Sequence, residues 1–181
     1  MKTVITAATL AVAVVTPAHA EIIESSVGGF ATRHSAVVTA DRRAVWNALL
    51  QPENWWSHTW SNDSGNLRLE ARAGGCFCET LPAADGWAAG SVEHMRVVFV
   101  QPGSTLRMSG SLGPLQSEGL AGTLTVTLED EEAGTRITWE YVTGGETRFD
   151  LAQIAPVVDS VQGEFLADLV AEVGDAVDDP G

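Results

Sequence analysis

The chain has 181 residues, of which 24 are acidic and 10 are basic, and its formal net charge is −14 at pH 7. This excess of negative charge repels nucleic acid and anionic lipid headgroups at long range, so we expect no nucleic-acid partner. Two cysteines are too few for a disulfide scaffold, and the fold must therefore depend on a hydrophobic core.

The first 20 residues have the features of a secretory signal peptide. Lys2 supplies a short positive start, residues 3–15 are almost wholly apolar or small, and residues 18–20 form an A-x-A cleavage site. The alternative is an uncleaved anchor, but the apolar run is too short to span a bilayer. We expect a periplasmic or secreted protein whose mature chain starts at Glu21, with nine arginines, no lysine and a net charge of −15. No later segment predicts stable membrane insertion.

The next part of the chain predicts one strand and two short helices. Residues 30–40 have a β-rich second half and form the first predicted strand. Asp41 is a suitable N-cap for a short helix over residues 42–50. Pro52 ends that helix, and residues 53–66 contain a second helical turn followed by a polar loop.

Six further strands follow in a meander. Their alternating apolar and polar residues, bounded by Gly and Pro, are typical of a sheet with one buried face. These predicted strands cover residues 66–72, 76–81, 91–100, 105–112, 123–129 and 135–142. The loop that starts at Gly113-Pro114 is either a turn folded over a cavity entrance or a plain connection.

The last predicted element is a long helix. Apolar residues recur at helical spacing from Ile154 to Val173, and Gly174 suits a C-terminal cap, which gives roughly 19 residues or ~28 Å. Pro156 suits the first turn of this helix, and Gly163 allows a close approach to the sheet.

This order of elements predicts an α+β fold of the helix-grip type. We expect a curved antiparallel sheet of six to seven strands wrapped around the long C-terminal helix, with two short helices after the first strand. Residues 21–29 form an N-terminal segment, residues 30–174 one domain, and residues 175–181 an acidic flexible tail.

Three segments resemble the SRPBCC superfamily, which includes START lipid-binding domains, the birch-pollen-allergen fold, polyketide cyclases and heat-shock ATPase activator-like proteins. They are "WNALLQPENWWS" (46–57), the pattern "GG.F.E" (74–79) and "VFVQPGSTLRMSG" (98–110). The resemblance covers residues 30–174. It implies a helix-grip fold with a cavity between sheet and helix, whereas function varies widely within the superfamily. The two cysteines depart from the pattern of the activator-like relatives.

The two cysteines stand in the sequence "GGCFCET". Cys76 and Cys78 project from the same face of one strand, with Cα atoms about 6.5–7 Å apart at ~3.3 Å rise per residue. This separation is near or beyond the usual limit for a disulfide, so a bond between them would need a bulge or strain.

The pairing of this strand with the next one assigns the faces. If the connecting loop centres on Gly86, Cys78 lies opposite His94 and Glu79 lies opposite Glu93. Phe77 then shares the core face with Met95, and the thiols share the other face with His94. A register error of one residue would reverse these assignments.

We predict that the protein binds a hydrophobic small molecule or lipid-like ligand in the cavity, as a monomer or weak homodimer and without a cofactor. Burial of apolar surface would drive the affinity. The predicted ligand-binding residues are Trp56, Phe77, Met95, Val97, Phe99, Leu106, Met108, Trp139, Tyr141 and Phe165.

Two other functions remain open at this point. One is a cyclase, dehydratase or hydrolase that uses Glu79 or Glu93 as general acid-base, because two carboxylates side by side in an apolar setting raise the pKa of one. The other is a thiol- or metal-handling protein built on Cys76, Cys78 and His94. The plainer alternatives are solvated or arginine-paired carboxylates and two thiols that pack as small hydrophobic groups.

Overall fold

The computed structural model describes residues 19–26, 28–174 and 176–177. The expected signal peptide lies outside the described residues except for His19 and Ala20, and the expected tail lies outside them except for Ala176 and Val177. No helix in the described ranges is long and apolar enough to cross a membrane.

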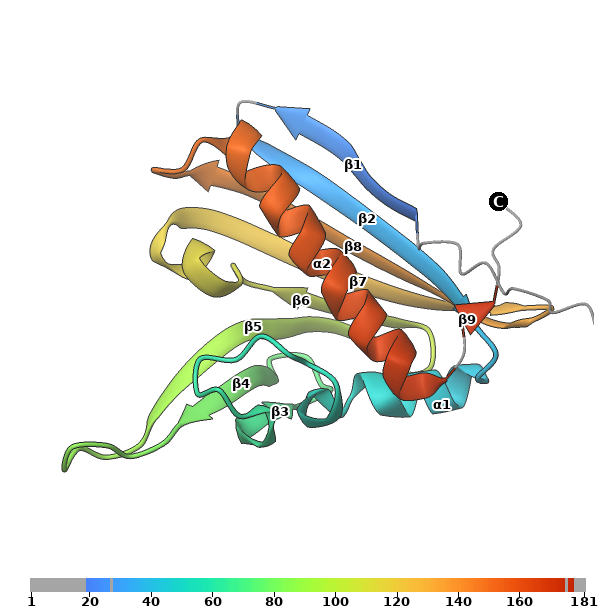
Figure 1. Ribbon diagram of the computed structural model, residues 1–181, viewed down its shortest axis with the longest axis horizontal. Helices are drawn as coiled ribbons and strands as arrows, with labels where there is room; N and C mark the ends of the chain where they lie inside the picture. Colours follow the sequence, from blue (N-terminus) through green and yellow to red (C-terminus); the bar gives the residue numbers. More distant parts are fainter. Residues whose placement is uncertain (1–18, 27, 175, 178–181) are drawn as a thin grey trace, which may run out of the picture.

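One antiparallel sheet and one long helix make up most of the structure (Figure 1). Within the described residues the sheet has nine strands in the order β1-β2-β8-β7-β6-β5-β4-β3, with β9 also paired to β2. The strands are β1 (His19–Ser26), β2 (Gly29–Val38), β3 (Leu67–Leu69), β4 (Cys76–Leu81), β5 (Gly90–Gln101), β6 (Thr105–Ser109), β7 (Gly119–Glu131), β8 (Gly134–Glu146) and β9 (Ala176–Val177). The expected helix-grip fold is confirmed.

Two of these strands come from segments in which we expected none. β1 pairs antiparallel with β2 and forms one edge of the sheet. β9 places Ala176 and Val177 beside Val38 and Val37 of β2. Neither segment has the long apolar alternation that marks a strand in the sequence, so both depend on the partner strand.

The short helices are positioned largely as expected. Helix α1 (Arg42–Leu49) begins after Asp41, whose side chain accepts a hydrogen bond from the backbone N–H of Ala44 at 2.8 Å. The second helical segment consists of two 3-10 turns, Pro52–Asn54 and Ser64–Asn66.

Helix α2 (Leu151–Val173) lies across one face of the sheet (Figure 1). It starts earlier than expected because Asp150 caps it and accepts a hydrogen bond from Ala152 N–H. Pro156 therefore lies inside the helix rather than in its first turn. The core between α2 and the sheet contains side chains that are at most 2% exposed, among them Leu124, Val126, Leu128, Ile137, Trp139, Tyr141, Phe165, Leu166 and Leu169.

Gly163 brings α2 close to the sheet, as the sequence predicted. A Cβ at this position would lie 3.0 Å from Cε1 and 3.2 Å from Nδ1 of His34 on β2. His34 is itself 2% exposed and its Nε2 lies 2.9 Å from Oδ1 of Asp159, so the ring has little room to move.

Strand β5 contains two irregularities that change which side chains face inward. In the pairing with β4, Met95 of β5 lies opposite Phe77, but the next residue of β4, Cys78, lies opposite Glu93. His94 is therefore an extra residue in β5. Its pairing with β6 shifts again between Val97 and Phe99. Each extra residue interrupts the alternation of faces, because side-chain direction along a strand has a period of two.

We expect Gly163→Val to lower the free energy of unfolding by about 1–3 kcal/mol, because the added methyl groups would press on the His34 ring. Ala167→Val, on the exposed side of the same helix, should cost less than ~0.7 kcal/mol. Urea denaturation of the two variants measures the difference. Equal effects would show that the contact between Gly163 and His34 is not tight.

Candidate functional site

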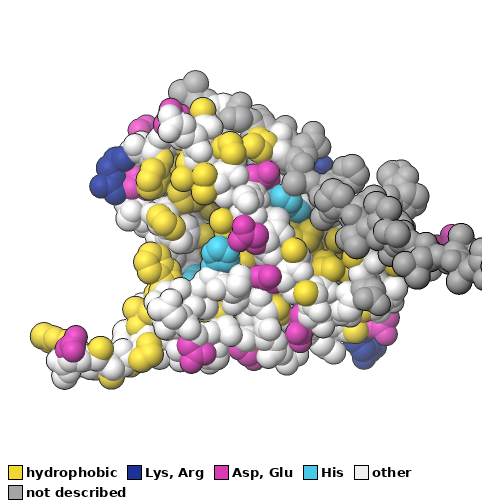
Figure 2. Space-filling view, in the orientation of Figure 1, with side chains coloured by type: hydrophobic (Ala, Val, Ile, Leu, Met, Phe, Trp, Pro, Cys, Tyr) yellow, Lys and Arg dark blue, Asp and Glu magenta, His cyan; other side chains and the backbone are white. Residues whose placement is uncertain are grey.

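A pocket of about 190 Å³ lies between the N-terminal half of α2, the segment that follows α1, and the loop between β6 and β7. Figure 2 shows hydrophobic side chains bordering a hollow on this side of the molecule. The apolar lining consists of Trp56, Trp60, Leu112, Gly113, Pro114, Leu115, Ile154, Val157, Val158, Val161 and Phe165. The polar lining consists of His58, His94 and Gln162. The pocket therefore suits an apolar ligand with few polar groups.

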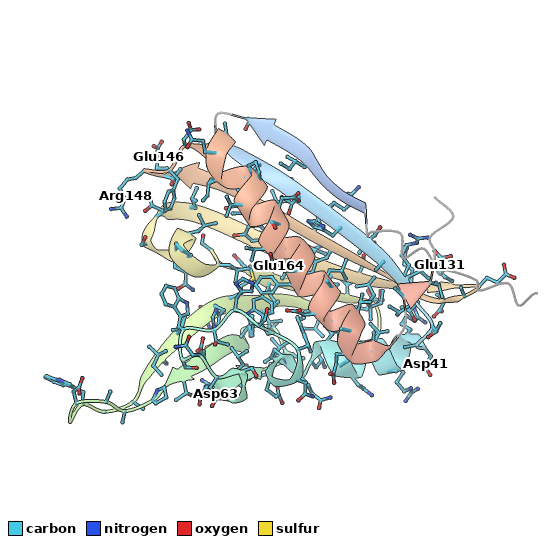
Figure 3. All side chains as sticks on the ribbon, viewed as in Figure 1. Asp41, Asp63, Glu131, Glu146, Arg148 and Glu164 are labelled. Carbon is cyan, nitrogen blue, oxygen red and sulfur yellow. A yellow bond between two sulfur atoms is a disulfide. The ribbon has the colours of Figure 1, made fainter. Side chains whose placement is uncertain are left out.

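One wall is the aromatic segment after α1. The ring of Trp56 stacks on that of Phe165 with centroids 3.6 Å apart. Two polar contacts tie the same segment to α2, because His58 Nε2 lies 2.9 Å from Oε2 of Glu164 and Ser57 Oγ donates to Asp168 at 2.6 Å. Glu164 lies on the middle of α2 in Figure 3. Trp55 packs edge-on against Trp139 instead and serves as an anchor of the segment.

The opposite wall is formed by the start of the 3-10 helix Gly113–Ser117. The loop that starts at Gly113-Pro114 is therefore more than a plain connection between two strands, because it lines the pocket. Gln116 Nε2 donates to the backbone carbonyl of Glu93 on β5 at 2.8 Å. At the end of the loop, hydrogen bonds from Arg148 and its charge lower the pKa of Glu118 to about 2. Arg148 lies three residues before the first residue of α2, so this pair connects the end of the loop to the start of the helix.

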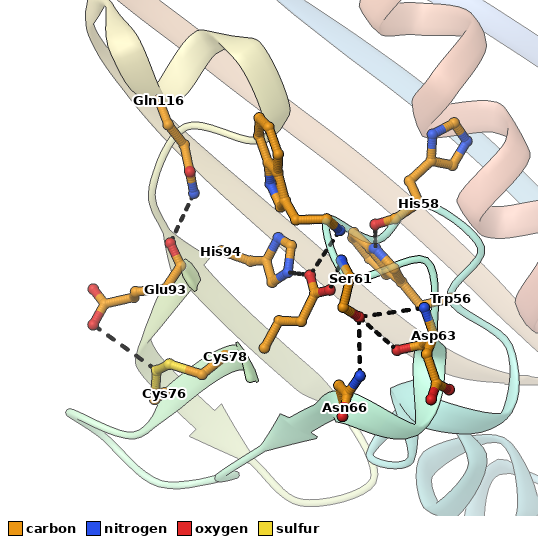
Figure 4. Close-up of polar contacts among 12 residues, drawn as sticks. Trp56, His58, Ser61, Asp63, Asn66, Cys76, Cys78, Glu93, His94 and Gln116 are labelled. Carbon is orange, nitrogen blue, oxygen red and sulfur yellow. Dashed lines mark hydrogen bonds and ion pairs between the residues drawn. A yellow bond between two sulfur atoms is a disulfide. The ribbon is translucent and has the colours of Figure 1, made fainter. Parts of the chain in front are cut away.

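A buried histidine–carboxylate pair adjoins the pocket (Figure 4). His94 lines the pocket and is 3% exposed, and its Nε2 lies 2.9 Å from Oε2 of Glu79. Glu79 is 0% exposed and also accepts hydrogen bonds from the backbone N–H groups of Trp60, at 3.0 Å, and Ser61. Both oxygens of the carboxylate therefore have donors, and the third donor is the imidazole.

The protonation states follow from these contacts. Burial raises the pKa of Glu79, but hydrogen bonds from Ser61, the Trp60 backbone and His94 outweigh it, and the net effect is a lowered pKa. Burial lowers the pKa of His94 more than Glu79 raises it. At neutral pH Glu79 is thus ionised and His94 is neutral, so the imidazole proton lies on Nε2, between the ring and the carboxylate.

The prediction that Glu79 faces inward was right, but its predicted pairing with Glu93 was wrong, because Glu79 lies opposite Val92. The extra residue in β5 turns His94 inward beside Glu79 and turns Glu93 outward, where it pairs with Arg96. The side chain of Glu93 is 44% exposed and does not line the pocket. Glu79 and Glu93 therefore form no carboxylate pair, and neither can act as the predicted acid-base in that way.

Only two of the ten predicted ligand-binding residues line the pocket, namely Trp56 and Phe165. Phe77, Leu106, Met108 and Trp139 surround a void of about 10 Å³ together with Trp56, and are otherwise packed core. Met95, Val97 and Tyr141 are also core. Side chains fill the space that we expected to be a cavity, because facing residues on α2 and the sheet interdigitate.

Phe99 differs most from expectation, whereas Tyr141 is buried in the core. The second irregularity of β5 turns Phe99 outward, where it is 42% exposed and lies under the guanidinium of Arg107. Tyr141 points inward, but its hydroxyl lies where Gly122 leaves room, since a Cβ there would come within 2.4 Å of it. Burial raises the pKa of Tyr141.

Cys76 and Cys78 form a disulfide, contrary to the prediction. Their Cα atoms are 5.4 Å apart, closer than in a regular strand, and the irregular pairing of β4 with β5 occurs between Phe77 and Cys78. The sulfur atoms lie near Glu93, on the other side of β5 from the inward-facing His94 (Figure 4). A metal site made of Cys76, Cys78 and His94 is therefore excluded by this arrangement.

The sequence interpretation did not single out several residues that build the pocket. Ser61 and Gln116 act through a backbone group and a single amide, and the sequence alone carries no signal for such contacts. Trp60 lines the pocket and also donates its backbone N–H to Glu79. Val157, Val158 and Val161 belong to the recognised apolar stripe of α2, but its N-terminal half faces the pocket and its C-terminal half faces the core.

Comparison with known proteins identifies the family. Residues 39–174 match the family model described as "Activator of Hsp90 ATPase homolog 1-like protein", so the chain belongs to that family and to the SRPBCC superfamily. A search of curated proteins gives no match.

Solved structures share the fold at low sequence identity. A putative uncharacterized protein from Rhizobium leguminosarum has a TM-score of 0.58 and 17% identity, with 87% of this chain and 98% of that chain covered. CalU16 from Micromonospora echinospora has a TM-score of 0.57 and 16% identity, with 87% and 84% covered. Protein MLL2253 from Mesorhizobium loti has a TM-score of 0.54 and 20% identity, with 80% and 98% covered. At this identity the likeness establishes the fold alone.

The lowered pKa of His94 predicts a specific dependence of stability on pH. The unfolded chain protonates this histidine near pH 6.5, whereas folded His94 stays neutral to lower pH. The free energy of unfolding should therefore fall as the pH drops below about 6.5, by up to ~1.4 kcal/mol per pH unit until the folded pKa is reached.

Denaturation of His94→Gln at pH values from 7 to 5 should show a shallower slope than the parent protein. Leu106→Val is the matched control, because it weakens the core without removing an ionisable group and should leave the slope unchanged. Parallel curves for the parent protein and His94→Gln would contradict the assignment.

Proposed function

We propose that the protein is an exported binding protein for a hydrophobic small molecule, held in the pocket between α2, the segment after α1 and the loop 112–115. The observation that carries the proposal is the pocket lining, in which eleven of fourteen residues are apolar or glycine. Burial of apolar ligand surface against these side chains contributes roughly 25 cal/mol per Å².

The size of the pocket limits the ligand. A volume of about 190 Å³ corresponds to about six water molecules at ~30 Å³ each. It is smaller than the ~300–1,000 Å³ of pockets that enclose drug-sized ligands. A one- or two-ring molecule fits these limits, as does one end of a longer ligand that extends through the mouth.

Export is supported by the N-terminal sequence and by the state of the cysteines. Residues 1–20 have the three parts of a signal peptide, and cleavage after Ala20 would keep Glu21–Ser26 of β1. The disulfide between Cys76 and Cys78 is compatible with an oxidising compartment. The name of the family refers to activation of a chaperone ATPase, and an exported protein would not meet a cytosolic chaperone.

A second candidate is an enzyme that removes a proton from the bound molecule. It is favoured by the contact of His94 with Glu79, because an ionised carboxylate stabilises the imidazolium that such a step forms. In this alternative His94, rather than Glu79 or Glu93, is the general base.

The binding proposal predicts that indene, an apolar two-ring hydrocarbon, binds in the pocket. Val158→Phe should weaken its affinity about tenfold or more, because the larger side chain fills part of the space. Isothermal titration calorimetry measures the affinity. Val142→Phe, at an exposed position of β8, is the matched control and should bind indene as the parent protein does. If Val158→Phe and Val142→Phe bind equally well, the pocket is not the binding site.

A further inference from the structure

His94 presents one nitrogen that the protein does not use. Nε2 is engaged by Glu79, whereas Nδ1 has no hydrogen-bond partner within the described part of the chain. The side chain is 3% exposed and lines the pocket. Within the described residues, the fully buried side-chain polar atoms without a partner are the hydroxyl oxygens of Thr32 and Tyr141. Nδ1 of His94 is not one of them, so a water molecule or a ligand in the pocket can reach it.

The chemistry of that nitrogen is set by Glu79. The carboxylate is ionised and can only accept hydrogen bonds, so it fixes the imidazole proton on Nε2. Nδ1 then carries a lone pair and is a hydrogen-bond acceptor, on a side chain that lines the pocket. Two backbone N–H groups, from Trp60 and Ser61, hold Glu79 in place, and Phe77 stacks on the imidazole ring with centroids 5.0 Å apart. The direction of the lone pair is therefore fixed before any ligand arrives.

We propose that the ligand of this pocket has an apolar ring body that bears one O–H or N–H donor, and that His94 selects it by accepting that hydrogen bond at Nδ1. This inference rests on the proposed binding function and adds the ligand class. Glu79 is a positioning residue, since it fixes the tautomer without contacting the ligand. A site built to accept a hydrogen bond rejects an analogue that lacks the donor.

Three two-ring molecules of similar shape separate the possibilities. Indole has an N–H donor, indene has no polar group, and 1-indanone has only an acceptor. The parent protein should bind indole about 3- to 10-fold more tightly than indene, because one net hydrogen bond changes the affinity by about this factor. It should bind 1-indanone no more tightly than indene.

His94→Phe should bind indole and indene equally. His34→Phe is the matched control, because His34 is also a buried histidine beside a carboxylate but does not line the pocket, and it should keep the preference for indole. A measurement without variants gives the same information. The ¹⁵N resonance of His94 Nδ1 should shift when indole is added and remain in place when indene is added.

The outcomes also separate this inference from the proposed function. If indene binds and Val158→Phe weakens it, but indole gains nothing, the binding function stands and the role of His94 is wrong. A preference for 1-indanone over indene would likewise overturn it, because the pocket would then offer a donor. If neither indole nor indene binds, the proposed function fails, and this inference fails with it.

Discussion

The extra residue in β5 determines the chemistry of the pocket. Without it, His94 would lie on the outer face of the sheet with the disulfide, and Glu93 would lie beside Glu79 on the inner face. Two carboxylates would then share a buried position, and each would raise the pKa of the other. With the extra residue, a histidine meets Glu79 instead, so a single negative charge is buried and has three hydrogen-bond donors. The bulge therefore makes the burial of Glu79 possible.

The segments around the pocket depend on the same region of β5. Gln116 binds the carbonyl of Glu93, next to the extra residue, and so holds the loop between β6 and β7. Glu79 binds the backbone of Trp60 and Ser61 and so holds the segment after α1. Both connections converge on two adjacent strands, β4 and β5. A change in their register would displace both walls of the pocket as well as the imidazole.

The sequence predicted most of the fold because its signals are local and repeated. The alternation in β7 and β8, the apolar stripe of α2, the Asp41 cap and the close approach at Gly163 were all confirmed. The inward direction of Phe77 and Glu79 was also right. The prediction failed at β5, because a bulge depends on pairing with a neighbouring strand and has no signature in the residues themselves. One undetected residue exchanged His94 with Glu93, and a second moved Phe99 outward.

The pocket itself was harder to predict than the fold. The superfamily resemblance implies a cavity under the long helix, but in this chain large side chains such as Trp139 and Met108 fill that space. The remaining space lies nearer the N-terminal half of α2, where Val157 and Val158 face a loop rather than the sheet. Packing of this kind is decided by many side-chain volumes together, which a single sequence does not reveal.

The protonation state of His94 is the most direct test of this account. Long-range ¹H–¹⁵N correlation spectra of ¹⁵N-histidine-labelled protein at pH 7, with His94→Gln used for assignment, report which ring nitrogen carries the proton. We predict a neutral ring with the proton on Nε2 and an unprotonated Nδ1. A proton on Nδ1, or a ring charged at both nitrogens, would contradict the proposal that Glu79 makes His94 a hydrogen-bond acceptor for the ligand.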